Sequence, residues 1–290
     1  IYLDMGRILR KCTTQEQRIK LGIFINKINT AATNTISLFL NILPPIVKVF
    51  LKSNLRLVKR MDYRKEDIFL DISSPIEYRV RLQSCSKEPE TVEWIENFFK
   101  NGEVFYDIGA NIGAYSLVAA KYLKGRITVY AFEPSFLNYA QLSKNIFLNK
   151  CQDSITPLSI ALSDKTMIGS FHHQNLVPGG ALHSFGKPVD HNNNTFIPVF
   201  TQPALSYTID DLIKAFNIPL PNHIKLDVDG IEMSILKGAQ ATCFGPPLRS
   251  ILVEMNDNDN DIIGYLAQWG FHPSSRHTKG DTPNYIFLRE

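Results

Sequence analysis

Cysteine is scarce in this sequence. The 290 residues include four cysteines, Cys12, Cys85, Cys151 and Cys243, and no two of them form a Cys-x-x-Cys pair. Structural zinc sites and disulfide frameworks need closely or regularly spaced cysteines, so the spacing indicates neither. We expect free thiols in a reducing compartment, and we predict a cytoplasmic protein.

Long hydrophobic runs are also lacking. The best candidate is Ile28–Val47, twenty residues without a charged side chain, which is about the length needed to cross a bilayer. Seven of these residues are Asn, Thr or Ser, and Pro44-Pro45 removes two backbone donors and interrupts a helix. The mainly apolar part, Ile36–Val47, is too short to cross, so we favour an amphipathic segment that docks at a surface.

Acidic residues are almost missing from the first 60 positions. Residues 1–60 contain eleven Lys or Arg against two acidic residues, a net charge of +9, whereas residues 61–290 contain 20 basic and 26 acidic residues, a net charge of −6. A basic segment on an acidic body predicts contact with something anionic, such as peripheral contact with a membrane. A helical extension with solvated lysines explains the charge equally well. We predict no nucleic-acid partner, and we divide the chain into a basic helical extension, residues 1–60, and a catalytic domain, residues 61–290.

The rest of the chain alternates between short apolar runs and helical patterns. The runs typical of buried strands are residues 104–108, 127–132, 155–162, 223–228 and 250–254. This alternation predicts an α/β fold with a doubly wound, mostly parallel sheet and a C-terminal antiparallel strand at 284–288. Earlier in the chain, residues 68–72 and 78–82 predict a small hairpin, whereas residues 163–206 predict an irregular region.

A glycine turn follows the first of these strands, in Asp107-Ile108-Gly109-Ala110-Asn111-Ile112-Gly113. Ligands of such sheets bind at the carboxyl ends of the strands, and glycine lets the backbone approach a ligand closely. A dinucleotide site prefers Gly-x-Gly-x-x-Gly around a pyrophosphate, but here the spacing is Gly-x-x-x-Gly. Asp107 suits a cationic ligand tail better than a pyrophosphate.

Two further strand ends carry groups that fit a nucleoside. Glu133 ends the second strand, twenty residues after Gly113, where a carboxylate can accept hydrogen bonds from both ribose hydroxyls. Ala161, Leu162 and Ser163 end the third strand, where an adenine edge would lie. Three consecutive strand ends therefore predict one nucleoside-binding site.

Several stretches of the sequence resemble the FkbM family of methyltransferases. They are Tyr106–Gly113, Phe132-Glu133-Pro134, Thr208–Leu212, Ile224-Lys225-Leu226-Asp227-Val228-Asp229-Gly230-Ile231-Glu232 and Leu236-Lys237-Gly238-Ala239. The resemblance covers about Lys87–Glu254. It implies a class I methyltransferase (Rossmann-like) fold, S-adenosylmethionine as cofactor, and O-methylation of sugar or natural-product hydroxyls. One departure is Asp229, where the family motif usually has Glu.

The resemblance and the strand ends together give the residues expected to bind S-adenosylmethionine. They are Asp107, Gly109, Ala110, Asn111, Gly113, Glu133, Pro134, Ala161, Leu162 and Ser163.

The fourth strand supplies the candidate catalytic residues. Side chains alternate along a strand, so Lys225, Asp227 and Asp229 are expected to point to one side. Such a group can orient an acceptor hydroxyl, take up its proton or hold a metal ion. We favour a metal-free site, because no histidine accompanies the carboxylates and Lys225 already supplies a positive charge. Glu232 follows in the first turn of a helix, where an acidic residue stabilises the helix end.

Other candidate residues have simpler explanations. His172, His173 and His183 fall in the irregular region, where a general base is conceivable but surface histidines are commoner. Glu254 ends the fifth strand and either lines the site or forms an ion pair. Asp257–Asp261 resembles a calcium loop but lacks the glycine and the glutamate that such a loop requires, so we predict a turn.

The sequence thus predicts an S-adenosylmethionine-dependent methyltransferase that acts on a hydroxyl of a small molecule or glycan. Two alternatives stay open, an NAD-dependent oxidoreductase and an inactive methyltransferase-like binding module. The missing Gly-x-Gly-x-x-Gly opposes the first, and the intact Asp107, Glu133 and Asp227 oppose the second.

Overall fold

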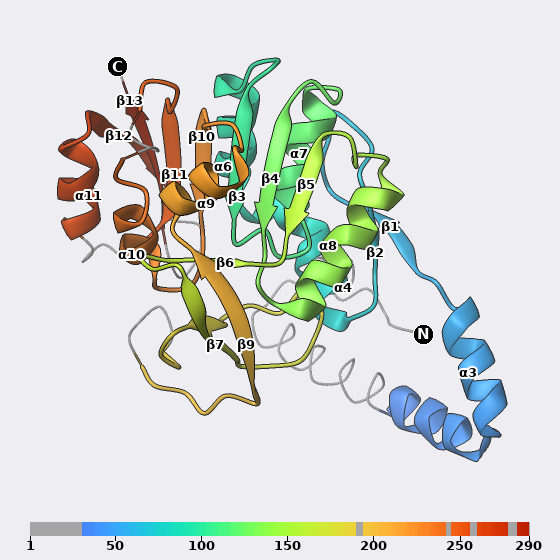
Figure 1. Ribbon diagram of the computed structural model, residues 1–290. Coiled ribbons are helices and arrows are strands. Elements are labelled where there is room, and N and C mark those ends of the chain that lie inside the picture. The colour runs from blue at the N-terminus through green and yellow to red at the C-terminus, as the bar shows by residue number, and fades with distance from the viewer. Residues whose placement is uncertain (1–30, 190–193, 242–244, 256–259, 278–282, 290) are drawn as a thin grey trace, which may run out of the picture. The chain divides into compact units, whose positions relative to one another are not determined.

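The computed structural model describes residues 31–189, 194–241, 245–255, 260–277 and 283–289. The chain divides into two compact units, residues 1–56 and 57–290 (Figure 1). This division lies close to the change of charge at residue 60. The assignment of catalysis to residues 61–290 alone stays a prediction.

The described part of the first unit is helical. One helix covers residues 31–42, and α3 covers Pro45–Asn54. The two helices meet at the double proline, with a bend that Figure 1 shows clearly, as expected where prolines remove backbone donors. None of the side chains of α3 is buried. No helix in the part of the chain that the structure describes is long and apolar enough to span a membrane.

A seven-stranded sheet forms the centre of the second unit, with the strand order β12-β13-β11-β10-β3-β4-β5. Its strands are β3 (Val104–Ile108), β4 (Thr128–Phe132), β5 (Ile155–Leu158), β10 (His223–Leu226), β11 (Ser250–Glu254), β12 (Phe271–His277) and β13 (Asn284–Arg289). The five neighbouring strands β5, β4, β3, β10 and β11 are parallel to one another. At the other edge, β13 pairs antiparallel with β11, and β12 pairs antiparallel with β13. This arrangement confirms the predicted class I methyltransferase fold. The strand order reverses between β3 and β10, which is where ligands of such sheets bind.

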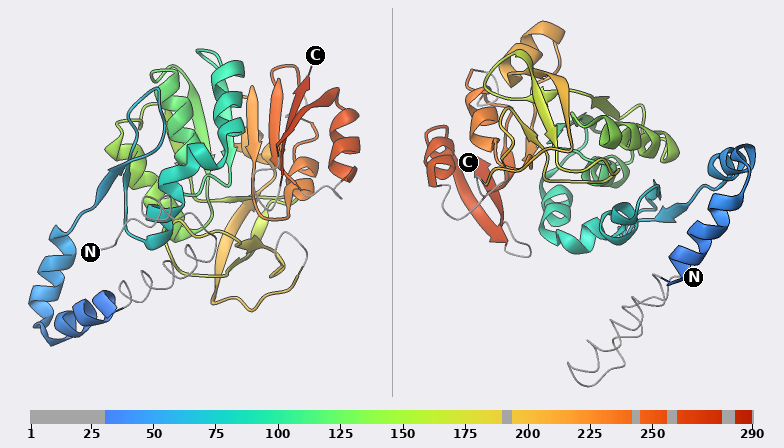
Figure 2. Two further views of the ribbon diagram at one scale, coloured as in Figure 1. Left: turned by 180° about the vertical axis from the view of Figure 1, so that it is seen from behind. Right: turned by 90° about the horizontal axis from the view of Figure 1, so that it is seen from below.

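Helices cover both faces of the sheet (Figure 2). One hydrophobic cluster includes side chains of α6 (Pro89–Phe98), α7 (Ala114–Tyr122) and α8 (Phe136–Leu148), and the other includes side chains of α9 (Ile209–Phe216), α10 (Glu232–Lys237) and α11 (Asn260–Ala267). Successive strand residues enter opposite clusters, with Phe105 in the first and Tyr106 in the second. Burial on both faces explains why these strands are continuous apolar runs in the sequence.

The predicted hairpin of residues 68–72 and 78–82 is wrong. β2 (Phe69–Asp71) pairs instead with β1 (Val58–Arg60). β1 lies in the segment that was predicted to be helical, so the extension ends before residue 58.

The second run of the predicted hairpin is helical. It contains α4 (Pro75–Arg79) and continues through the short helices η1 (Arg81–Gln83) and α5 (Ser84–Lys87). Ser74 Oγ accepts a hydrogen bond from the Glu77 N–H at 3.1 Å, and Glu77 Oε2 accepts one from the Ser74 N–H at 2.8 Å. This reciprocal capping starts a helix and outweighs the strand-like alternation.

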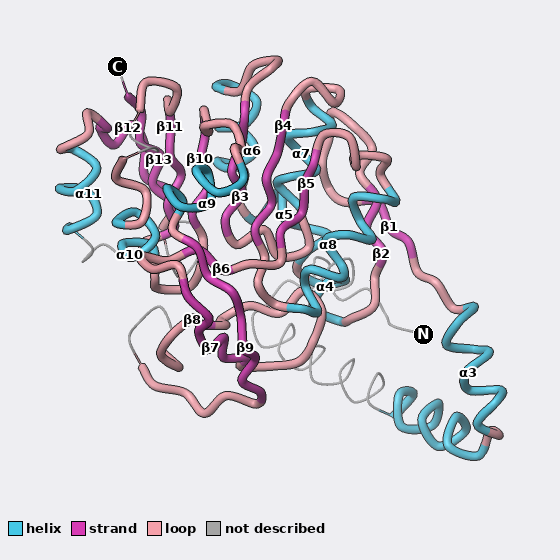
Figure 3. Tube along the Cα trace, in the orientation of Figure 1, coloured by secondary structure: helices cyan, strands magenta, loops and turns pink. Residues whose placement is uncertain are grey.

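A second, smaller sheet replaces the expected irregular region. Its order is β6-β9-β7-β8, with β6 (Ala161–Leu162), β7 (Met167–His173), β8 (Ser184–Phe185) and β9 (Phe200–Tyr207). The predicted strand 155–162 therefore divides between the two sheets, as β5 and β6. Figure 3 shows the small sheet beyond the carboxyl ends of the parallel strands.

Candidate functional site

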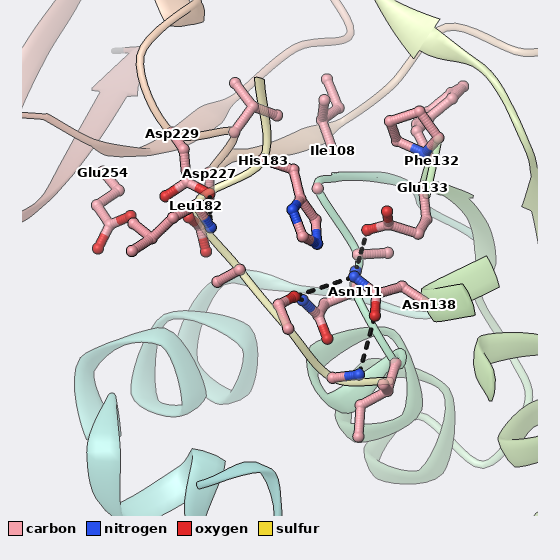
Figure 4. A pocket seen from close by; sticks show the side chains of 18 of the residues that line it. Ile108, Asn111, Phe132, Glu133, Asn138, Leu182, His183, Asp227, Asp229 and Glu254 are labelled. Carbon is pink, nitrogen blue, oxygen red and sulfur yellow. Dashed lines mark hydrogen bonds between the residues drawn. The ribbon is translucent and has the colours of Figure 1, made fainter. Parts of the chain in front are cut away.

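A cavity of about 610 Å³ lies at the carboxyl ends of β3, β4, β10 and β11. The cavity wall includes the last residues of three of these strands, Ile108, Phe132 and Glu254, and Asp227, which follows the end of β10 (Figure 4). The small sheet contributes Phe171. The volume is typical of a small-molecule site, for which roughly 300–1,000 Å³ is usual.

The glycine turn after β3 forms part of this wall. Gly109 has φ +81°, and a Cβ on it would lie 1.8 Å from the backbone oxygen of Asp227. Gly113 has φ +88°, and a Cβ there would lie 2.5 Å from Leu142 Cδ1. The two glycines are therefore required by the packing of the turn against β10 and α8.

Glu133 follows β4 and is buried in the cavity wall. Its Oε2 accepts a hydrogen bond from the Asn111 N–H and its Oε1 one from the Ser135 N–H, both at 2.8 Å. Burial raises the pKa of the Glu133 carboxyl to about 7, although these two bonds oppose the rise. Each oxygen keeps a further lone pair, so the carboxylate fits the expected pair of ribose hydroxyls.

Asn111 joins the turn to the opposite wall. Its Nδ2 donates to Gly180 O at 2.7 Å. Its Oδ1 is buried and has no hydrogen-bond partner among the residues that the structure describes. An unpaired buried acceptor costs free energy, so a donor group on a ligand is the expected partner.

Residues 174–183, which we call the covering segment, close one side of the cavity. Asn138 binds this segment twice, because its Oδ1 accepts from the Gly179 N–H at 2.9 Å and its Nδ2 donates to Gly180 O at 3.1 Å. Arg81 Nε donates to Gly179 O at 2.9 Å. These partners are far apart in the sequence, so no local pattern reveals the contact.

β10 and β11 place three ionisable side chains together. Leu226 lies opposite Val253 in the parallel register, so the following residues, Asp227 and Glu254, are neighbours, and their side chains are hydrogen-bonded. Lys225 Nζ donates to Asp227 Oδ2 at 2.6 Å. All three residues line the cavity.

Burial favours the neutral form of each of these groups, and their contacts decide which ones carry charge. Burial tends to raise the pKa of Asp227, but the Lys225 ammonium and the hydrogen bond from Glu254, with smaller effects, together hold that pKa below its usual range. Burial and the negative charge of Asp227 raise the pKa of Glu254 to about 10. Burial tends to lower the pKa of Lys225, but the charges of Asp227 and Asp107 outweigh it and raise that pKa. At neutral pH the cluster is therefore an ion pair, Lys225 with Asp227, beside a protonated Glu254.

Asp229 lies in the turn after β10. Because the strand ends at Leu226, the expectation that Asp229 shares a strand face with Lys225 and Asp227 is wrong. Asp229 has φ +60°, and its Oδ2 accepts from the Leu182 N–H of the covering segment at 2.7 Å. It still lines the cavity. The catalytic roles of these three residues stay predictions.

Three of the expected cofactor-binding residues lie outside the cavity lining. Asp107 is buried behind the wall, where Ser116 Oγ donates to its Oδ2 at 2.5 Å and burial raises the pKa of its carboxyl. Gly113 is also outside, and Ser163 Oγ donates to Lys165 O at 2.9 Å. Their cofactor contacts stay predictions. The expected residues that do line the cavity are Gly109, Ala110, Asn111, Glu133, Pro134, Ala161 and Leu162.

Of the three histidines considered, His183 lines the cavity. Its Nδ1 accepts from the Gln174 N–H at 3.3 Å. Burial, with the nearby His173 and the charge of Arg81, lowers the pKa of His183 to about 4. His172 and His173 lie in β7 outside the lining, and each hydrogen-bonds to a residue of β9. His183 is therefore neutral at physiological pH.

The remaining acidic candidates are not part of the wall. Glu232 Oε1 accepts from the Gly230 N–H at 3.1 Å and stabilises the turn before α10, which agrees with the helix-end explanation. Residues 257–259 of the suspected calcium loop lie outside the described residues. Among the residues that are described, no group of three or more potential metal ligands is found; a metal-free site stays a prediction.

Sequence reasoning missed the short helices before β3. Arg81 of η1 and Lys87 of α5 line the cavity. Lys87 Nζ pairs with Glu88 Oε1 at 3.0 Å. No motif marks Arg81 or Lys87, and Arg81 lies in a segment predicted to be a strand.

Comparisons with known proteins place the chain in a family. The model of the Methyltransferase FkbM domain matches residues 107–273. Hexuronic acid methyltransferase AglP of Haloferax volcanii is 23% identical over 158 residues, which are 54% of this chain and 59% of that protein. The 31-O-demethyl-FK506 methyltransferase FkbM of Streptomyces tacrolimicus is 24% identical over 191 residues, covering 59% of this chain and 73% of that protein.

Solved structures are similar at lower identity. One is M. jannaschii TYW2 in complex with AdoMet, with 12% identity, a TM-score of 0.43, and coverage of 81% of this chain and 87% of that chain. The family model spans more than half of the present sequence, including the glycine turn, Glu133 and the Lys225–Glu232 motif. The chain therefore belongs to the FkbM family of methyltransferases.

Proposed function

We propose that this chain transfers a methyl group from S-adenosylmethionine to a hydroxyl oxygen of a sugar, glycan or other natural product. The observation that carries the proposal is Glu133, whose two oxygens are each held by one backbone N–H and face a cavity at the reversal point of the sheet. A carboxylate in this position suits the two hydroxyls of a ribose.

The residues present fit S-adenosylmethionine. Glu133 would accept from the ribose hydroxyls, and the unpaired Oδ1 of Asn111 would accept from another donor of the nucleoside or its tail. Phe132, Ala161 and Leu162 give an apolar surface for a base. When bound, this cofactor supplies an activated methyl group on a sulfonium.

The acceptor side of the cavity would be formed by Asp227 and its neighbours. Lys225 keeps Asp227 ionised, so Asp227 is the group that can accept the hydroxyl proton. Glu254 stays protonated and donates to Asp227, which fixes the orientation of that carboxylate. Alignment of the hydroxyl oxygen contributes the larger part of the rate, because the methyl group is already activated.

The hydroxyl acceptor is supported by the two relatives, of which one is named for a hexuronic acid and the other for an O-demethyl natural product. The spacing of the glycines and the family membership give no support to the NAD-dependent alternative. The inactive methyltransferase-like binding module remains as the alternative, and the experiment below distinguishes it from an active methyltransferase.

Two measurements test the proposed function. Calorimetry should show that S-adenosylhomocysteine binds and that NAD does not. Protein incubated with methyl-labelled S-adenosylmethionine and a glycan and lipid extract should then transfer label to a base-stable ether. Binding without transfer to any extract favours the inactive module, and failure to bind the homocysteine nucleoside refutes the proposal.

We also propose peripheral contact between the first unit and an anionic membrane surface. Ile46, Val49 and Phe50 on α3 are 74%, 61% and 64% exposed, whereas Lys48 and Lys52 lie on another side of the same helix by the period of 3.6. Exposed apolar side chains with lysines on the opposite face are typical of helices that lie in a membrane interface.

A further inference from the structure

The cavity contains one cation that stands apart from the others. Its lining includes Arg81, Lys87 and Lys225. Lys225 is bound to Asp227 at 2.6 Å and Lys87 to Glu88 at 3.0 Å. Among the residues that the structure describes, Arg81 has no ion-pair partner, and its side chain makes one hydrogen bond, the donation from Nε to the backbone oxygen of Gly179.

That single bond fixes how Arg81 is presented. Nε is taken by the covering segment, and Gly179 packs so closely that a Cβ on it would lie 3.5 Å from Arg81 Cγ and 2.8 Å from Glu77 Cγ. Gly179 of the covering segment thus packs against both the stem of Arg81 and Glu77 of α4. The two terminal nitrogens of the guanidinium remain, and they form a planar pair of donors that matches the two oxygens of a carboxylate.

The charge of Arg81 reaches both sides of the cavity. Burial has the largest effect on the pKa of Glu133 and raises it. The two backbone hydrogen bonds lower this pKa, and the charge of Arg81 lowers it further. It also contributes to the low pKa of His183, after burial and His173. Because Arg81 Nε is bound to Gly179 O, an anion on its terminal nitrogens would lie beside the covering segment and within reach of these charges.

The surroundings favour an anion with a single charge. Besides Glu133, the carboxylates of Glu88, Asp227 and Asp229 line the same cavity, and their negative potential opposes a doubly charged phosphate more than a carboxylate. Arg81 is half-buried and has no ion-pair partner among the described residues, so its guanidinium gains most from an anion that supplies two acceptor atoms in one plane.

We propose that Arg81 is a carboxylate-binding residue of this cavity. The inference rests on the proposed function, because two carboxylates are expected there: that of the amino acid tail of S-adenosylmethionine and that of an acidic sugar acceptor. Both present the same chemistry to the guanidinium, and the experiment separates them.

The experiment measures binding to the full chain by calorimetry. The probes are S-adenosylhomocysteine, 5′-methylthioadenosine, which keeps the nucleoside and lacks the amino acid tail, and D-glucuronate. The variants are Arg81→Met and Arg81→Lys, with Arg64→Met as a control on an exposed arginine outside the cavity.

If the tail is the ligand, Arg81→Met weakens S-adenosylhomocysteine by about 10- to 100-fold, the usual effect of losing charged hydrogen bonds, and leaves 5′-methylthioadenosine within about twofold. Arg81→Lys then recovers part of the loss. If the acceptor is the ligand, S-adenosylhomocysteine is unchanged and glucuronate binding is lost.

Two results overturn the inference. One is that Arg81→Met changes neither S-adenosylhomocysteine nor glucuronate binding. The other is that it weakens 5′-methylthioadenosine as much as S-adenosylhomocysteine, which would mean that Arg81 only supports the covering segment. A wild-type chain that binds neither nucleoside refutes the proposed function instead, and the glucuronate arm still decides whether Arg81 binds a carboxylate.

Discussion

The pH dependence of nucleoside binding tests the role of Glu133. Burial raises the pKa of this carboxyl to about 7, against the effect of the backbone N–H bonds from Ser135 and Asn111. In the proposed complex it is the ionised form that accepts from both ribose hydroxyls. About a tenth of the molecules carry this form at pH 6 and about nine tenths at pH 8. Because the competent fraction sets the apparent affinity, we expect binding to strengthen about tenfold, or about 1.4 kcal/mol, between these pH values.

The assay is calorimetry with 5′-methylthioadenosine, whose ribose is intact and which has no amino acid tail to titrate. Two other cavity groups titrate outside the window, since the pKa of His183 is about 4 and that of Glu254 about 10. Glu133→Gln should remove the slope. Glu232→Gln is the matched control, because burial raises the pKa of Glu232 to about 7 as well, but Glu232 lies outside the cavity lining.

Two outcomes would show that this explanation is wrong. One is an affinity that stays constant from pH 6 to pH 8 in the wild-type chain. The other is the same slope in Glu133→Gln as in the wild type. A slope lost in Glu232→Gln and kept in Glu133→Gln would assign the titration to the turn before α10.

Three further predictions concern stability and surface contact. Gly109→Ala should lower the free energy of unfolding by about 3 kcal/mol or more, because its Cβ would lie 1.8 Å from a backbone oxygen at φ +81°. The control Gly264→Ala has nothing within 4 Å of its Cβ in a helix and should raise this free energy by up to about 1 kcal/mol. Equal effects of the two variants in urea titrations would contradict this. Glu232→Gln should flatten the pH dependence of the free energy of unfolding by about 3 kcal/mol, because a buried carboxyl with a raised pKa loses its stabilising contribution as pH rises from about 4.5 through about 7. An unchanged pH profile of unfolding would refute it. The chain should sediment with anionic vesicles more than with neutral ones, and Phe50→Ser should reduce this binding several-fold. Phe147 is 77% exposed in α8, and the control Phe147→Ser should leave the binding unchanged. Equal losses in the two variants would exclude contact through α3.

The sequence was informative where structure depends on local pattern. The parallel strands are buried on both faces and appear as continuous apolar runs, so β3, β4, β10 and β11 were predicted close to their observed bounds. The cavity wall around Gly109 and Glu133 was also predictable, because the carboxyl ends of neighbouring parallel strands meet at one edge. The helical break at the double proline follows from the missing backbone donors alone.

Features that depend on contacts between distant residues were missed. β7 pairs with β9, and the covering segment lies between these two strands in the sequence. Local periodicity does not indicate a pairing between strands so far apart in the chain. The capping pair of Ser74 and Glu77 turned an apparent strand into a helix, which in turn placed Arg81 in the cavity. The contact between Asp227 and Glu254 follows from strand register, which requires the folded sheet.

The ion pair on β10 determines how the proposed base must be tested. Asp227→Asn removes a carboxylate that could accept the hydroxyl proton, and we expect methyl transfer into the acceptor extract to fall by about 10²–10⁴. The same substitution leaves the buried Lys225 without its 2.6 Å partner, and breaking a buried pair typically costs about 3–5 kcal/mol. A loss of activity in this variant alone is therefore ambiguous between chemistry and folding.

The double variant Lys225→Met with Asp227→Asn separates these effects. It removes both charges, so the buried ammonium no longer lacks a partner, and we expect the free energy of unfolding to recover most of its loss. Transfer should stay low, because no carboxylate at this position can take up the proton. Measured side by side in urea titrations and label-transfer assays, recovered stability without recovered transfer supports Asp227 as the base. If transfer returns together with stability, Asp227 serves only to neutralise Lys225, and the base must be sought at Asp229.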